Sequence, residues 1–124
     1  MKKIFFLCAG IVIIIIAGEF FLQRKTFENF DYMIDLLNDI DEKNDTNTKL
    51  ENIEKIESFW KNKYLLMAFY IDHVELEKIK SQIVVIKAGI EKHDEPFVHE
   101  EIKRTIYMIE HIKDKIVIKA DNIL

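Results

Sequence analysis

The sequence predicts an all-α protein in which an N-terminal transmembrane helix is followed by a small antiparallel bundle of three or four helices. Three observations lead to this fold class. The 124 residues include one Pro and three Gly, so few positions interrupt a helix. Apolar residues recur at intervals of three and four, the spacing of one helix face. Residues 4–18 are all apolar or small, which is typical of a membrane-spanning segment.

Residues 1–25 are predicted to be a transmembrane signal-anchor that contacts membrane lipid through residues 4–22. These 19 residues would span about 28 Å as a helix, close to the hydrocarbon core of roughly 30 Å. Glu19 lies one turn from the end of the stretch, where its carboxylate reaches the headgroups. A cleaved secretory signal also has a basic start and an apolar core. Cleavage after Ala17 or Gly18 would place Ile where a small residue is normally required, so a retained anchor is favoured.

The basic residues that flank the anchor are nearly balanced, with Lys2 and Lys3 before it and Arg24 and Lys25 after it. A short basic N-terminal tail usually stays in the cytoplasm. We therefore expect a single-pass protein of the cell membrane, with residues 26–124 on the extracytoplasmic side.

Residues 26–124 are predicted to form the helical bundle domain. They contain 14 Lys and Arg and 21 Asp and Glu, a formal charge of −7. This charge repels phosphate backbones and anionic lipid, so we expect no nucleic-acid binding and a domain that stands off the membrane beyond Arg24 and Lys25. One Cys cannot form an internal disulfide, and three Gly do not supply a phosphate-binding loop.

The helices of this domain are predicted from their apolar stripes and their punctuation. Residues 26–41 form the first and can simply continue the membrane helix, and the acidic, amide-rich residues 38–48 are a loop with Thr46 or Thr48 as the next cap. The following run to about residue 92 has two stripes out of phase, so we expect a bend or break near Ile71, with Asp72 and Glu75 as a candidate capping box. Pro96 starts the last helix, which extends to about residue 119. The predicted core residues are Phe27, Phe30, Met33, Ile34, Leu37, Ile40, Leu50, Ile53, Ile56, Trp60, Tyr64, Leu65, Met67, Phe69, Leu76, Ile79, Ile83, Ile86, Ile90, Val98, Ile102, Ile106, Ile109, Ile112 and Ile116.

Four His residues are the obvious candidates for metal binding or acid–base chemistry, but their spacing is poor. None has a Glu three residues before it, as di-metal bundles require, and HExxH is absent. A hairpin cluster of His93, Asp94, Glu95 and His99 could surround an ion, although an ordinary solvated loop is favoured. We therefore predict no catalytic residue, no metal and no cofactor, and hence a protein that is not an enzyme.

Aromatic residues cluster between Phe59 and Tyr70, with His73 one turn further on. Aromatic side chains at helical spacing are usually part of a core, so packing is favoured over ligand binding. Any exposed part of this face would be the best contact surface, because aromatic residues often anchor interfaces. Trp60, Phe69 and His73 are the candidate partner-binding residues. Of these, we expect Trp60 to be mainly structural and His73 to lie at the edge of the face.

The same residues carry a resemblance to a known family. Trp60 is followed by an apolar run into DHVEL at residues 72–76, and the Pro-initiated last helix contains HIKD at residues 111–114 and ends in NIL at residues 122–124. The whole chain resembles a family of small membrane-anchored proteins from endospore-forming bacteria, catalogued only as a domain of unknown function. The resemblance implies a multi-pass membrane protein as partner and no assigned active-site residue.

We therefore expect a non-catalytic accessory protein whose extracytoplasmic bundle contacts a membrane partner. The alternative is a small ligand-sensing bundle. Because only about three residues precede the predicted anchor, such a sensor would have to signal through a partner.

Overall fold

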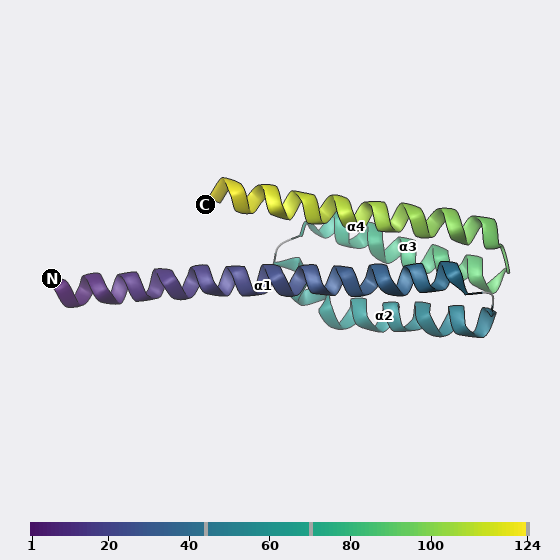
Figure 1. Cartoon of the computed structure of the whole chain (residues 1–124), viewed down its shortest axis with the longest axis horizontal. Helices are drawn as coiled ribbons and strands as arrows, with labels where there is room; N and C mark the ends of the chain where they lie inside the picture. Colours follow the sequence, from purple (N-terminus) through teal and green to yellow (C-terminus); the bar gives the residue numbers. More distant parts are fainter. Residues whose placement is uncertain (44, 70, 124) are drawn as a thin grey trace.

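The computed structural model describes residues 1–43, 45–69 and 71–123, and the side chains as far as Val117. These residues form four helices and no strand: α1 (Lys2–Glu42), α2 (Thr46–Ala68), α3 (His73–Glu91) and α4 (Glu95–Ile123). Short turns join them, so consecutive helices are antiparallel (Figure 1). Contacts of α1 with α2, α2 with α3, α3 with α4 and α4 with α1 close the bundle. The predicted all-α fold is confirmed, with four helices in the bundle.

Helix α1 is one continuous helix of 41 residues in two different environments. Its first half projects beyond the other helices (Figure 1), and its first buried side chain is that of Thr26. This half is long and apolar enough to cross a membrane, and none of its apolar window is buried; a signal sequence would meet the same criterion. The second half packs in the bundle. The predicted continuation of the apolar helix through residues 26–41 is therefore confirmed.

Most predicted core positions are buried. Complete removal from water stabilises the fold by about 1.5–3 kcal/mol for each large apolar side chain. Phe27, Ile34, Leu50, Tyr64 and Ile106 are only partly buried, at the margin of the core. The buried apolar side chains are Phe30, Met33, Leu37, Ile40, Ile53, Ile56, Trp60, Met67, Ile71, Leu76, Ile79, Ile83, Ile86, Ile90, Val98, Ile102, Ile109, Ile112 and Ile116.

Two predicted core residues are exposed instead, Leu65 at 79% and Phe69 at 81%. Leu65 directly follows Tyr64, so it lies about 100° around the helix from the stripe that continues to Met67. Phe69 follows the last residue of α2, and the chain then turns so that Ile71 takes the buried position. The prediction is wrong for Leu65 because it lies off the buried stripe, and for Phe69 because it lies beyond the end of α2.

The connection between α1 and α2 is shorter than the predicted loop of residues 38–48. Ile40 is fully buried, and the carboxylate of Asp39 accepts a hydrogen bond of 2.7 Å from Asn52 Nδ2 on α2. These contacts favour the helical conformation through Glu42 despite the polar composition. Only residues 43–45 separate the two helices.

Asp45 is the N-cap of α2, so the predicted caps Thr46 and Thr48 are wrong. Its carboxylate accepts hydrogen bonds from the backbone N–H of Asn47 at 3.3 Å and from the hydroxyl of Thr48 at 3.0 Å. Such bonds satisfy donors that the first turn of a helix leaves free. Thr48 therefore supports the cap from inside the helix.

The predicted break near Ile71 is confirmed, since α2 and α3 are separate helices there. Asp72 is the N-cap of α3, but its side chain makes no cap hydrogen bond. Glu75 instead forms an ion pair with Lys115 of α4. The predicted capping box is wrong because Glu75 pairs with Lys115 on another helix.

The turn between α3 and α4 brings the two helices close together. Asp94 caps α4, since its carboxylate accepts a hydrogen bond of 3.2 Å from the Phe97 N–H. His93 has a φ of 57°, and the Asp94 N–H donates to the Gly89 carbonyl at 3.1 Å, a bond typical of helix ends. A Cβ on Gly89 would lie only 2.8 Å from Phe97 Cδ1. The approach of α3 to α4 thus requires a glycine.

Candidate functional site: the α2–α3 face

A pocket of about 500 Å³ lies between α2 and α3, on the face where the aromatic cluster is predicted. Its walls combine apolar surface with charges of both signs. The residues that line it are Glu57, Trp60, Lys61, Tyr64, Leu65, Glu77, Lys80, Ile83 and Val84. We call this pocket, together with the exposed residues Phe69, His73 and Val74 around the following turn, the α2–α3 face.

Trp60 forms the buried floor of this face. The residue is only 3% exposed, as the packing interpretation predicts. Its Nε1 has no hydrogen-bond partner among the residues that the structure describes. The contribution of Trp60 to stability therefore comes from the packing of its ring. A partner that docks on the present surface would contact the neighbours of Trp60 rather than Trp60 itself.

His73 lies at the edge of the face, in a polar cluster that joins α2 to α3. Its Nδ1 is 2.7 Å from the Tyr64 hydroxyl, which donates to Glu77 Oε1 at 3.2 Å. Partial burial and then the hydrogen bond to Glu77 raise the pKa of Tyr64. Tyr64 and Glu77 contact the imidazole of His73, while 75% of the His73 side chain stays exposed.

Glu77 is the member of this cluster that our sequence analysis missed. It follows His73 by four residues, the spacing of side chains on one helix face, and its carboxylate lies 3.9 Å from His73 Nε2. The i, i+4 spacing was a signal for this pair. Its contact with Tyr64 depends on how α2 and α3 are rotated, which no spacing within one helix reveals.

A second ion pair fixes α2 to α3 at the opposite end of the pocket. Lys87 Nζ lies 3.1 Å from Glu57 Oε1. The close contact with the charged Glu57 carboxylate raises the pKa of Lys87.

The turn between α2 and α3 carries three strongly exposed apolar side chains. Phe69 is 81% exposed, Leu65 79% and Val74 64%. We call these three residues the hairpin tip. Of the candidate partner-binding residues, Phe69 and His73 are thus accessible and lie on either side of the turn, whereas Trp60 is beneath the surface.

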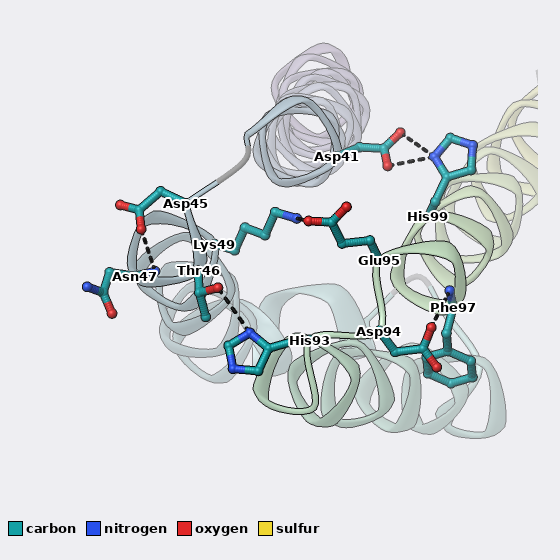
Figure 2. Close-up of polar contacts among 10 residues, drawn as sticks. All are labelled: Asp41, Asp45, Thr46, Asn47, Lys49, His93, Asp94, Glu95, Phe97 and His99. Carbon is teal, nitrogen blue, oxygen red and sulfur yellow. Dashed lines mark hydrogen bonds and ion pairs between the residues drawn. The ribbon is translucent and has the colours of Figure 1, made fainter.

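The predicted hairpin cluster lies at the other end of the bundle, between α3 and α4. Figure 2 shows that its side chains turn toward different partners. His93 Nδ1 is 3.3 Å from the Thr46 hydroxyl of α2, whereas the Asp94 carboxylate caps α4 at Phe97. Both residues have a local structural role at the turn.

The two remaining members of the cluster contact α2 and α1. Glu95 Oε1 is 3.9 Å from Lys49 Nζ, and His99 Nδ1 is 2.6 Å from Asp41 Oδ1 (Figure 2). In the described part of the chain, no group of three His, Cys, Asp or Glu side chains is arranged to hold a metal ion. The fourth histidine, His111, stacks on Tyr107 with 6.3 Å between ring centroids.

The comparison with protein families gives one result. The family model described as "Domain of unknown function (DUF4363)" matches residues 20–123, which include the whole bundle. This agrees with the resemblance to an uncharacterised family. No curated protein and no solved structure matches the chain.

Proposed function

Since the chain belongs to the DUF4363 family, a domain of unknown function, we propose a role from its own structure. The protein is a single-pass, non-catalytic accessory protein of the cell membrane. Residues 1–25 are the uncleaved anchor, and the extracytoplasmic bundle of residues 26–124 contacts a multi-pass membrane protein. The resemblance to a membrane-anchored family of endospore-forming bacteria implies such a partner.

The continuity of α1 is the observation that carries this proposal. The same helix contains the apolar window and contributes Phe30, Met33, Leu37 and Ile40 to the core. A helix without a break transmits its position and rotation along its whole length, whereas a flexible linker would let the bundle drift. The α2–α3 face is therefore held at a fixed height and direction relative to the bilayer. That constraint suits contact with a neighbour in the same membrane.

The composition of the α2–α3 face supports a protein partner. The pocket combines apolar walls with charged residues, and 75% of the His73 side chain is exposed at its edge, where it contacts Tyr64. An apolar centre bordered by polar groups is typical of protein interfaces. The −7 charge of residues 26–124 favours a partner other than nucleic acid.

Co-purification of the tagged full chain from its native membranes in mild detergent tests the proposal. We expect a multi-pass membrane protein to co-purify with the parent. His73→Ala should lose this protein while keeping its helicity, since the side chain is exposed. The matched control is His111→Ala, which removes another exposed imidazole from α4 and should retain the partner. If no membrane protein co-purifies, or if both variants behave alike, the proposal is wrong.

The alternative function, a ligand-sensing bundle that signals through a partner, is supported by the pocket of about 500 Å³. This volume is within the range of small-molecule sites. A ligand should raise the melting temperature of the parent but not of Val84→Trp, because an indole at this half-open wall fills the pocket. A screen in which no small molecule shifts the parent would contradict the sensor function.

A further inference from the structure

We propose that the hairpin tip of Leu65, Phe69 and Val74 inserts into the lipid interface of the bilayer that holds the anchor. This inference rests on the proposed anchor and adds a second point of lipid contact. The bundle would then contact the bilayer through α1, which crosses it, and through the α2–α3 turn and the end of α4 at its surface.

The register of α1 and α2 fixes the height of the tip. Asn52 Nδ2 contacts Asp39 at 2.7 Å, and the rings of Phe59 and Tyr32 lie 4.8 Å apart. The two contacts are seven residues apart on α1 and also seven residues apart on α2. The two antiparallel helices therefore keep the same axial register between these contacts.

Ten residues from the Phe59–Tyr32 contact toward the apolar segment lie Phe69, which directly follows α2, and Leu22 on α1. Both helices cover about 15 Å in this distance. Phe69 is therefore level with the last residue of the lipid-contacting segment 4–22. The turn between α2 and α3 lies on the side of the bundle from which the N-terminal half of α1 projects (Figure 1).

Helix α4 gives independent evidence for the same level. The Gln23 side-chain amide donates to the carbonyl of Ile116 at 3.5 Å, which places the next residue, Val117, beside the end of the apolar segment. Val117 is 45% exposed. Leu65, Val74 and Val117 thus meet solvent near the height where α1 changes from apolar to charged. Helix α4 continues past this height to Ile123, so its last turns enter the interface together with the tip.

The chemistry of the tip favours lipid over the other surfaces that it might meet. An exposed Phe with neighbouring Leu and Val gains free energy by entering the boundary between headgroups and acyl chains, to a depth of about 5–10 Å. The domain is acidic, so this contact is hydrophobic rather than electrostatic. Asp72 lies between Phe69 and Val74 and is exposed, so its carboxylate remains among the headgroups. The tip is an apolar exception on a domain whose charge otherwise holds it away from anionic lipid.

The experiment uses the full chain in vesicles of zwitterionic phosphatidylcholine, with a fluorescent thiol probe on one Cys at a time. Native Cys8 reports on the anchor. Phe69→Cys and Val74→Cys, each with Cys8→Ser, report on the tip. Val84→Cys with Cys8→Ser is the matched control, because Val84 is 60% exposed on the same helix as Val74 but about 15 Å further along it. Lipids with bromine near the headgroup end of the acyl chains quench probes that touch them.

We expect bromolipid to quench the probes at positions 8, 69 and 74 and to leave the probe at position 84 unchanged, independently of salt. Quenching at position 8 without quenching at 69 and 74 overturns this inference and leaves the anchor intact. If position 8 is not quenched either, the proposed anchor fails as well. A third result is that bromolipid does not quench the probes at positions 69 and 74, and that these probes become less exposed to water as the number of protein molecules per vesicle rises. A second copy then covers the tip, and the inference is wrong.

Discussion

His99 Nδ1 lies 2.6 and 2.8 Å from the two carboxylate oxygens of Asp41, a contact that joins α4 to α1 at the end of the bundle away from the apolar segment. The partners are 58 residues apart in sequence. Both are partly exposed, so the pair stabilises the closure of the bundle without being part of its core.

Separate removal of the two partners tests this pair. Asp41→Asn and His99→Gln should each lower the free energy of unfolding by about 1 kcal/mol, because a charge-assisted hydrogen bond is lost. The double variant should cost less than the sum of the two. Urea unfolding followed by circular dichroism measures all three, with His111→Gln as a neutral control. Additive costs would show that the pair contributes nothing.

The anchor should be retained in the mature protein. Intact-mass analysis of protein from native membranes is expected to give residue 1 or 2 as the N-terminus, because the residues before Gly18 do not suit signal peptidase. A mature start at Gly18 or Glu19 would contradict this prediction.

The fragment of residues 26–124 should be soluble and strongly helical without metal. Its apolar stripes already form a core, and its His side chains are turned toward separate partners. Circular dichroism and thermal unfolding should be the same with and without a chelator. A large fall in melting temperature on chelation would restore the hairpin cluster as a metal site.

Truncation of Trp60 in α2 and truncation of Phe69, which follows α2, should have very different effects on the stability of this fragment. Trp60→Ala should cost about 3–5 kcal/mol, because it leaves a cavity in the core. Phe69→Ala should change stability by less than about 0.5 kcal/mol, since its side chain is exposed. Urea unfolding compares the two. A Trp60 variant that unfolds like the parent but loses the membrane partner would assign Trp60 to the interface instead.

Gly89→Ala should destabilise the bundle, although Ala usually stabilises a helix by about 0.5–1 kcal/mol relative to Gly. The added methyl would lie 2.8 Å from Phe97 Cδ1 and 2.9 Å from Val98 Cγ2. Val98 is buried and cannot easily move, so we expect a net cost of about 1–3 kcal/mol from overpacking. Ser81→Ala, at an exposed position of α3, is the control and should not lower the melting temperature. An equal gain in both variants would show that α4 moves away freely.

The sequence by itself determined the fold class and most of the core. The positions of Phe30, Ile53, Ile79 and Ile109 follow from the helical repeat of 3.6 residues, which is a local property and is visible in the spacing of apolar residues. The cap at Asp94 was predictable for the same reason, because the bonds of a helix start lie within one turn of the chain.

Only the tertiary structure decided the exposure of Phe69, the contact of Tyr64 with Glu77 and the pairing of Asp41 with His99. Each depends on the rotation and the axial register of one helix relative to another. Side-chain packing across the bundle sets both quantities, and the spacing within a single helix does not contain them. The height of the hairpin tip beside Leu22 follows from that register.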